Sequence, residues 1–271
     1  MPELPEVETT RRGIAPLITH RCVTDVIVRQ FNLRWPIPAD LRGALTGQTI
    51  TGIQRRGKYL LLSTSTGTLL IHLGMSGSLR VLPASVPAGK HDHVDIVFDN
   101  HSVLRLRDPR RFGAVLWLED DPLRHKLLNK LGVEPLAKEL SAAYLFGAAR
   151  RRKVAIKTFI MDSHIVVGVG NIYANEALFL AGIRPTLAAN RVNRPRMESL
   201  VLAIKQVLKR AIRSGGTTLR DFTRGDGRPG YFQQQLNVYG RAGEACKQCG
   251  APIKLIRQAQ RATYYCSHCQ K

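Results

Sequence analysis

The chain has 271 residues, of which 44% are hydrophobic, so it can bury a sizeable core and favours two domains with a small additional module. No stretch approaches the roughly 20 apolar residues that span a bilayer, and no secretory leader is recognisable, so we expect a cytoplasmic protein without a membrane partner. Lys and Arg number 41 against 20 acidic residues, and the net charge of +21 favours a polyanionic partner, above all nucleic acid. An anionic membrane surface, or a charge that serves only solubility, is the alternative.

The first residues read MPELPEVETTRRG and predict a helix that begins close to the N-terminus. Pro5 suits a first helical turn, where its missing N–H costs little, and Glu6 and Glu8 favour the positive end of the helix dipole. This interpretation accounts for the stretch without any chemistry.

A chemical interpretation of the same stretch depends on removal of Met1, which leaves Pro2 with a free secondary amine. An N-terminal amine titrates near pH 8 (about 7.7–8.0), so part of it is neutral and nucleophilic at neutral pH. Attack on a sugar C1′ would give a cationic iminium that withdraws electrons during elimination, and Glu3 would lie beside the reacting centre. Taken alone, these residues favour the helix start over catalysis.

Residues 22–118 mostly alternate between apolar and polar side chains. The runs 59–62 and 68–73 predict one hairpin, and the runs 93–98 and 103–107 predict another. Short antiparallel strands without long helices between them predict a two-sheet β-sandwich. Lys58, at the start of one strand, is a candidate proton donor or phosphate contact, although a solvated strand end is the simpler explanation.

Two loops place an apolar residue beside glycines or cations. HLGMSG at 72–77 contains Met75, and DPRRFG at 108–113 contains Arg110 and Phe112. Apolar loop tips next to a cation can fill the gap left by a base that rotates out of the DNA stack. Taken singly, Met75 and Phe112 are more often core residues.

After residue 132 the apolar pattern becomes helical. The strongest predicted helix spans 196–213 and stops at Gly215 and Gly216. The run RRRK at 150–153 is a generic phosphate-binding patch. GVGN at 168–171 lets backbone amides approach an anion, with Asn171 at a helix start, although a plain turn between helices explains it too.

Four of the five cysteines form two pairs near the C-terminus, and their spacing is typical of a zinc site. The pairs are Cys246-x-x-Cys249 and Cys266-x-x-Cys269. Two disulfides are the alternative, which nothing else in the sequence supports. Arg261 lies between the two pairs, in a basic segment that suits binding to a nucleic-acid groove. The alternative is that the ribbon is purely structural and Arg261 is only a surface charge. The fifth cysteine, Cys22, is more typical of a small core residue than of a nucleophile.

Together these features closely resemble the bacterial formamidopyrimidine-DNA glycosylase family, nearly end to end and in the family's order. The matching stretches are PELPEVET at 2–9, HLGMSG at 72–77, DPRRFG at 108–113, GVGNIY at 168–173 and the four-cysteine tail. The resemblance implies an α+β fold with an N-terminal helix and two-sheet β-sandwich at 1–134, a helix-two-turn-helix DNA-binding domain at 135–235 and a zinc-finger β-hairpin at 236–271. It also implies one structural zinc ion and a nucleoid-associated monomer that binds damaged double-stranded DNA.

The resemblance further implies excision of oxidised purines, such as 8-oxoguanine and formamidopyrimidines, followed by β,δ-elimination of the strand in base excision repair. The residues it implicates are the Schiff-base nucleophile Pro2, the general acid Glu3, the supporting carboxylate Glu6, the β-elimination proton donor Lys58 and the δ-elimination residue Arg261.

Three further groups of residues are implied to touch DNA. The void-filling wedge consists of Met75, Arg110 and Phe112. The DNA-binding residues are His91, Arg110, Arg152, Lys157, Asn171 and Arg261. The lesion-recognition loop contains Thr217, Thr218 and Arg220, with Arg where some relatives carry Lys, so lesion preference stays open.

Two rival functions are compatible with parts of the sequence. An endonuclease VIII-like glycosylase would prefer oxidised pyrimidines, but such relatives tend to begin Pro-Glu-Gly-Pro-Glu and lack this wedge, so Leu4 and Phe112 argue against it. A non-catalytic zinc-ribbon protein would bind DNA without any need for a free amine at Pro2.

Overall fold

The computed structural model describes residues 2–216 and 235–271, which form two compact units. The described part of the first unit comprises residues 2–129 and 214–216, and that of the second comprises residues 130–213 and 235–271. Among the helices within these ranges, none is long and apolar enough to cross a bilayer.

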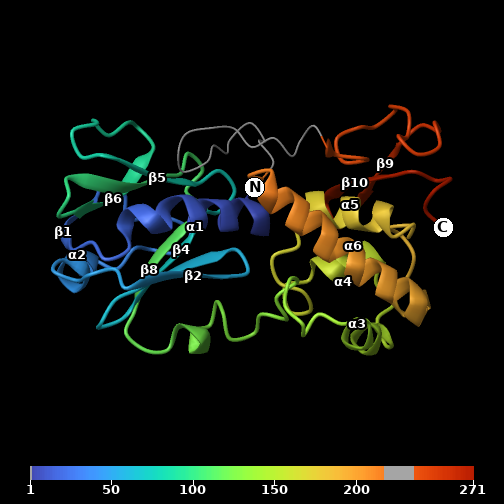
Figure 1. Cartoon of the computed structure of the whole chain (residues 1–271), viewed down its shortest axis with the longest axis horizontal. Coiled ribbons are helices and arrows are strands. Elements are labelled where there is room, and N and C mark those ends of the chain that lie inside the picture. Colours follow the sequence, from blue (N-terminus) through green and yellow to red (C-terminus); the bar gives the residue numbers. More distant parts are fainter. Residues whose placement is uncertain (1, 217–234) are drawn as a thin grey trace. The chain divides into compact units, whose positions relative to one another are not determined.

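Within the described part of the first unit, eight strands form two four-stranded antiparallel sheets (Figure 1). The first sheet has the order β1 (Val23–Val28), β6 (Asp92–Phe98), β7 (Ser102–Arg107) and β5 (Ser78–Pro83). The second has the order β2 (Gly52–Arg56), β3 (Tyr59–Ser63), β4 (Thr68–His72) and β8 (Ala114–Leu118). The two predicted hairpins are therefore confirmed as β3–β4 and β6–β7.

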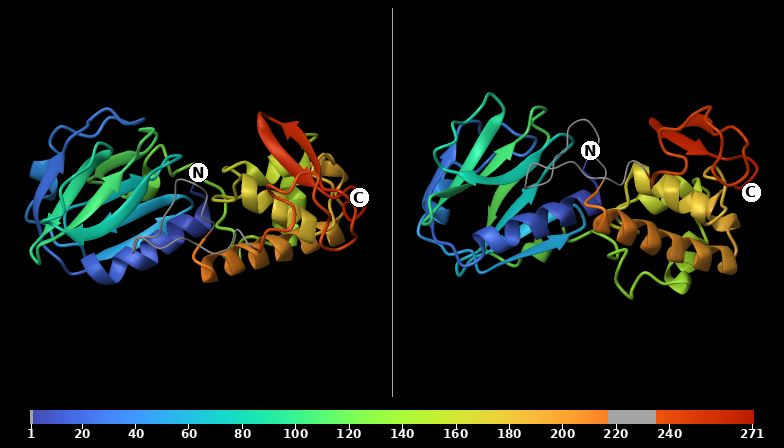
Figure 2. Two further views of the ribbon diagram at one scale, coloured as in Figure 1. Left: turned by 90° about the horizontal axis from the view of Figure 1, so that it is seen from above. Right: turned by 45° about the horizontal axis from the view of Figure 1, so that its top comes forward.

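Helix α1 (Leu4–Ile18) packs along the sandwich and contacts β2 and β3 of one sheet and β5 of the other (Figure 2). Its apolar face buries Val7, Ile14 and Ile18 in the same core as the inward residues of the strands, which hold the helix by hydrophobic burial. The described part of the unit also contains two short elements, α2 (Leu41–Leu45) and the 3₁₀ turn η1 (Pro122–Arg124). This packing fixes where the N-terminus of α1 lies within the first unit.

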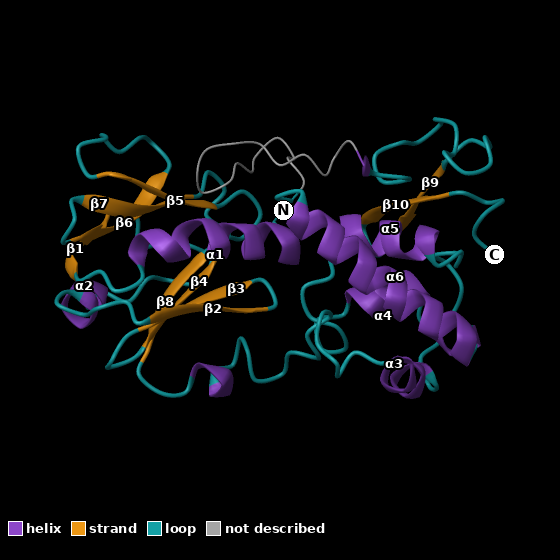
Figure 3. Cartoon of the chain, in the orientation of Figure 1, coloured by secondary structure: helices purple, strands orange, loops and turns teal. Residues whose placement is uncertain are grey.

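The second unit is helical apart from a C-terminal hairpin (Figure 3). Its elements are α3 (Ala142–Ala149), α4 (Ile156–Met161), α5 (Asn171–Leu180), η2 (Ala189–Arg191), α6 (Arg194–Arg213), β9 (Lys254–Gln258) and β10 (Arg261–Tyr265). The longest helix, α6, buries the apolar face that the sequence predicts and is followed by Gly215 and Gly216, both with positive φ. Helices α3 and α5 pack against it.

The β9–β10 hairpin and its cysteines pack against helix α5. Phe179 of α5 shares a buried cluster with Ile253, Cys246 and Cys266, and Tyr264 of β10 packs against that cluster. The predicted sandwich, helical region and cysteine-bearing hairpin are thus confirmed.

Candidate active site and nucleic-acid interface

The N-terminus of α1 gathers the residues for which the sequence predicts nucleophilic chemistry. Pro2 and Glu3 are buried, and Glu3 is the residue that caps the helix. The Glu6 carboxylate, only 2% exposed, accepts a hydrogen bond from the Glu3 backbone N–H at 2.9 Å, as in a capping box. Pro5 lies in the first turn, so the helix-start interpretation is confirmed. The same contacts fix the direction in which the chain leaves the helix toward Pro2.

Gly216 lies directly beside Glu6 in the first unit. Its φ is +82°, and a Cβ atom at this position would lie 3.0 Å from Oε1 of Glu6. Glycine is therefore needed here both for the backbone conformation and for the close approach. The segment predicted for lesion recognition, with Thr217, Thr218 and Arg220, lies outside the described residues.

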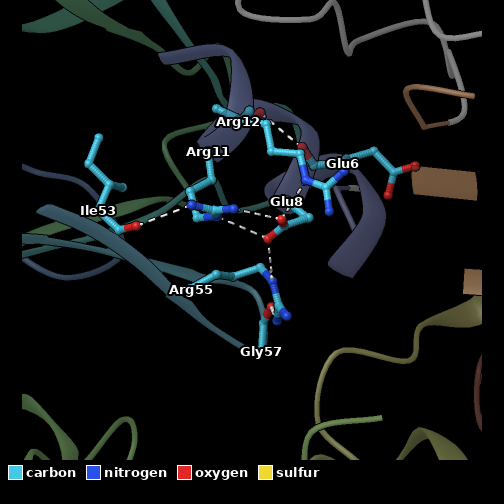
Figure 4. Close-up of polar contacts among 8 residues, drawn as sticks. Glu6, Glu8, Arg11, Arg12, Ile53, Arg55 and Gly57 are labelled. Atoms are coloured by element: carbon cyan, nitrogen blue, oxygen red, sulfur yellow. Dashed lines mark hydrogen bonds and ion pairs between the residues drawn. The ribbon is translucent and has the colours of Figure 1, made fainter. Parts of the chain in front are cut away.

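Glu8 forms a charged cluster that joins α1 to strand β2 (Figure 4). Its carboxylate accepts hydrogen bonds from Arg11 at 2.9 and 3.1 Å, from Arg12 at 2.7 Å and from Arg55 at 3.1 Å. Burial by itself would raise the pKa of Glu8, but the hydrogen bonds from Arg11 and Arg12 and the charges of Arg11 and Arg55 outweigh it and lower the pKa to about 2. Glu8 is therefore ionised throughout the physiological range.

Lys58 lies in the two-residue loop that joins β2 to β3. The last cross-strand pair is Arg56 with Tyr59, and Gly57 takes the first loop position with φ of +57°. A two-residue hairpin loop with Gly at its first position is a preferred tight turn. Lys58 is partly buried and therefore extends from a geometrically constrained point.

His72, at the end of β4, organises the loop that carries Met75. Its Nδ1 accepts the Gly74 N–H at 3.1 Å, and its ring lies 4.7 Å from the ring of Tyr59. Burial, together with the positive charges of Lys58 and Arg34, lowers the pKa of His72 to about 4. The imidazole is thus neutral near pH 7 and can accept this hydrogen bond.

The two loops that are predicted to form a wedge are joined through Asp108, which is completely buried. Its carboxylate accepts the Ser76 hydroxyl at 2.9 Å and the Gly113 N–H at 2.8 Å. The Ser76 oxygen in turn accepts the Arg110 N–H at 3.2 Å. Each loop therefore restrains the other.

The tips of these loops face solvent, as a DNA-inserting wedge requires. Met75 is 36% and Phe112 40% exposed, and the Arg110 guanidinium lies 4.9 Å from the Phe112 ring centroid. With Asn32, Leu33, Arg34 and Arg111 they line an open hollow of about 550 Å³. His91 lies next to this assembly, because its carbonyl accepts the Asp108 N–H at 3.0 Å. The first unit thus brings all the predicted wedge residues together.

In the second unit, two predicted DNA contacts meet at the residue after Arg261. The Lys157 ammonium donates to the Ala262 carbonyl at 2.9 Å and to the Thr263 hydroxyl at 2.7 Å, and Asn171 Nδ2 donates to the same carbonyl at 3.0 Å. Lys157 is only 1% exposed. Its ammonium therefore holds the β9–β10 hairpin, and a direct contact between Lys157 and DNA stays a prediction.

Arg152 and Arg261 are exposed and line one pocket of about 310 Å³ beside Lys157. Their two guanidinium groups make this pocket attractive to phosphate. Asn171 begins helix α5 after Gly168, whose φ is +85°, so the predicted Gly-Asn helix start is confirmed.

Two buried residues of α5 were not recognised in the sequence. Glu176 accepts four N–H bonds at 2.9 Å, from Val238, Tyr239 and both the backbone and side chain of Asn237. Asn175 accepts the Tyr264 N–H at 2.8 Å. Both acceptors anchor the cysteine-bearing segment to α5. Polar residues within the apolar pattern of 171–180 were the available signal.

The four paired cysteines converge on one point, as the spacing predicts. Their sulfur atoms all lie within 4.8 Å of one another, with Cys246–Cys269 at 3.9 Å and Cys249–Cys266 at 3.4 Å. Tetrahedral zinc with Zn–S bonds of about 2.3 Å requires sulfur–sulfur distances of about 3.8 Å. The four thiolates therefore fit one structural zinc ion. Cys22, in contrast, is half-buried in the first unit.

Family models match three parts of the chain. The formamidopyrimidine-DNA glycosylase N-terminal domain matches residues 1–115, and the formamidopyrimidine-DNA glycosylase H2TH domain matches residues 131–223. The zinc finger found in FPG and IleRS matches residues 243–271.

The chain is also similar to individual proteins over its full length. It is 60% identical to the formamidopyrimidine-DNA glycosylase of Thioalkalivibrio sulfidiphilus, with 100% of both chains covered. It is 34% identical, with a TM-score of 0.92 and 100% of both chains covered, to Lactococcus lactis Fpg in a complex with DNA that contains an abasic site. The same values describe its similarity to wild-type Lactococcus lactis Fpg in a complex with DNA that contains N7-benzyl-Fapy-dG.

Proposed function

The chain belongs to the formamidopyrimidine-DNA glycosylase family, and from that premise we propose that it excises oxidised purines from duplex DNA and cleaves the strand at the resulting site. It is a bifunctional DNA glycosylase and AP lyase of base excision repair. The observation that carries the proposal is the buried Glu3–Glu6 hydrogen bond at the start of α1, directly after Pro2.

The first step is nucleophilic attack by Pro2, which requires removal of Met1. Bond formation between the Pro2 nitrogen and C1′ displaces the damaged base, which leaves with the electrons of the glycosidic bond. The departing base takes a proton from Glu3, which is the proposed general acid. Opening of the sugar ring gives a cationic iminium, the Schiff base. Glu6 supports this step because its hydrogen bond to the Glu3 N–H fixes the position of Glu3.

The second step is strand cleavage. Loss of a C2′ proton sends electrons into the iminium and expels the 3′ phosphate, and Lys58 is the proposed proton donor for this β-elimination. Arg261 is the proposed residue for expulsion of the 5′ phosphate and for binding the flanking phosphates, which suits its exposed position beside Arg152.

The remaining predicted contacts divide between the two units. His91 and the wedge of Met75, Arg110 and Phe112 belong to the first unit, where an exposed apolar tip suits the gap left by an everted base. Arg152 and Asn171 in the second unit suit phosphate binding, and Lys157 supports the hairpin from inside.

Several features beyond the site complete the proposal. We place the domain boundaries at 1–134, 135–235 and 236–271. The four cysteines would hold one zinc ion, which stabilises the hairpin. A monomer acting on cytoplasmic DNA, and thereby associated with the nucleoid, is the expected cellular form. The loop with Thr217, Thr218 and Arg220 is proposed to contact the lesion.

Borohydride trapping tests the central step. With a duplex that contains one 8-oxoguanine opposite cytosine, we expect a covalent protein–DNA adduct from the wild type, whose loss of Met1 is first verified by mass spectrometry. Pro2→Gly, which replaces the secondary amine with a primary one, should strongly reduce the adduct, whereas Pro16→Ala, an exposed proline in α1, should retain it. No adduct with correctly processed wild type would exclude the Schiff-base mechanism. Faster release of an oxidised pyrimidine would favour the endonuclease VIII-like alternative.

A further inference from the structure

We infer that Glu8 and Arg55 form a clamp that positions Lys58 relative to helix α1, which carries Pro2. This inference rests on the proposed function, because it concerns the geometry of the elimination step. It makes Glu8 and Arg55 positioning residues, since they act on the reaction through the loop that bears Lys58.

Arg55 is the connecting element of the clamp, because its guanidinium binds at two ends. Its Nε donates to Glu8 Oε2 at 3.1 Å, while its Nη1 donates to the Gly57 carbonyl at 2.9 Å (Figure 4). The first bond reaches helix α1 and the second reaches the loop residue that precedes Lys58. A planar guanidinium with several fixed donors can make both bonds at once, which a lysine ammonium on a flexible stem cannot reproduce.

The Glu8 end of the clamp is fixed in turn. The Glu8 and Arg55 side chains are 10% and 12% exposed, so solvent screens their ion pair weakly. Arg11 also holds the Glu8 carboxylate and donates to the Ile53 carbonyl of β2 at 3.3 Å. Both Arg11 and Arg55 therefore join helix α1 to strand β2, and Arg55 also reaches the loop through the Gly57 carbonyl.

The loop itself transmits this restraint to Lys58. Gly57 is buried and holds a φ of +57°, and Lys58 is the next residue before β3 begins. With the Gly57 carbonyl held by Arg55, rotation of the peptide between Gly57 and Lys58 is restricted. The position of the Lys58 Cα is thereby fixed relative to helix α1, which begins directly after Pro2 and Glu3.

Proton transfer depends strongly on such positioning, because donor and acceptor must come within hydrogen-bond distance. The attack by Pro2 depends on the start of α1, where the Glu6 carboxylate accepts the Glu3 backbone N–H in a hydrogen bond that does not include Arg55. Disruption of the clamp should therefore slow elimination more than it slows formation of the Schiff base.

The test compares the two steps on a duplex with one preformed abasic site opposite cytosine, under single turnover. Borohydride-trapped adduct at early times reports attack by Pro2, and strand cleavage reports elimination. For Arg55→Lys and Glu8→Gln we expect near-normal adduct formation but elimination slowed by roughly ten-fold or more, as for a displaced catalytic group. Because Arg55→Lys keeps the positive charge, it distinguishes a two-ended clamp from simple charge neutralisation. The same variant still tests the inference if Glu8→Gln fails to fold.

Arg12→Gln is the matched control, because Arg12 binds the same carboxylate at 2.7 Å but is 59% exposed. It should cleave like the wild type. The inference is overturned if Arg55→Lys cleaves normally, or if adduct formation and elimination fall by the same factor. A wild type that neither forms the adduct nor cleaves would instead remove the proposed function.

Discussion

The Ser76 hydroxyl donates to the Asp108 carboxylate at 2.9 Å, and through this bond the loop of Met75 and the loop of Phe112 form one assembly. Asp108 is completely buried, and its backbone carbonyl also accepts a hydrogen bond from Nε2 of His93 at 2.8 Å. The Asp108 carboxylate thus accepts hydrogen bonds from both loops, from the Ser76 hydroxyl and from the Gly113 N–H.

Asp108→Asn should therefore loosen the wedge while nearly preserving its shape. We expect excision of 8-oxoguanine opposite cytosine to fall by about ten-fold, because the wedge tips lose their position, while affinity for undamaged duplex changes little. Single-turnover excision and binding titrations at one salt concentration measure the two quantities. Phe112→Ala should show the same pattern, because it removes the tip itself.

Asp99→Asn is the control for this prediction, since Asp99 is an exposed residue at the end of a hairpin. Its excision rate should equal that of the wild type. Equal losses of excision and of undamaged-duplex binding in Asp108→Asn would reduce Asp108 to a general stabilising residue.

Zinc removal should act on the second unit alone. Cys249→Ser removes one of four sulfur ligands that lie within 4.8 Å of one another. Elemental analysis should therefore show the zinc content falling from one ion per chain toward none, and binding to abasic-site DNA should weaken. Cys22→Ser, in the first unit, should retain both zinc and binding. Undiminished zinc in Cys249→Ser would contradict the four-cysteine site.

Lys157→Met separates an internal role from a phosphate contact. If Lys157 holds the hairpin, the variant leaves the Ala262 carbonyl and Thr263 hydroxyl with one partner fewer, and the second unit loses about 1–3 kcal/mol of unfolding free energy. A direct phosphate contact would instead lower the salt slope of log K by about 0.9 without loss of stability. Thermal unfolding and salt titration distinguish these outcomes, with exposed Lys153→Met as the comparison.

The Glu8 cluster predicts a stability loss in acid. The pKa of Glu8 falls from 4.5 to about 2 on folding, so its contribution is complete above pH 4.5 and is lost as the pH drops through about 2. The contribution is at most about 3 kcal/mol and is reduced by screening at the exposed Arg12. When the pH is lowered from 5 to 2, roughly the interval of the shift, the unfolding free energy of Glu8→Gln should therefore fall by less than that of the wild type.

Tryptophan fluorescence suits this last measurement, because Trp35 and Trp117 are the chain's two tryptophans and both belong to the first unit. Urea unfolding followed at each pH then reports the unit that contains Glu8. Parallel pH profiles for Glu8→Gln and the wild type would show that the cluster is not a source of stability.

The sequence predicted most of the fold, because the deciding signals are local. Alternation at 59–73 and 93–107 gave the two hairpins, and the apolar face at 196–213 matches the buried face of α6. The cysteine spacing likewise predicted a convergent site without any knowledge of the fold.

The supporting residues of the site could not be predicted, because their partners lie far away in sequence. Glu8 and Arg55 are 47 residues apart, Ser76 and Asp108 are 32 apart, and Lys157 and Ala262 are 105 apart. A charged side chain with a distant partner resembles an ordinary surface charge until the fold is known. Lys157 shows this most clearly, since a basic run precedes it and suggests exposure that the structure does not give it.

The contact between Gly216 and Glu6 has a consequence for protein engineering. Because any side chain at 216 would need both a left-handed backbone and the space that Glu6 occupies, an engineered chain should keep glycine at this position. A chimaera that takes its downstream segment from another family member should therefore be joined after Gly216, so that the close contact of this glycine with the supporting carboxylate of Glu6 is retained.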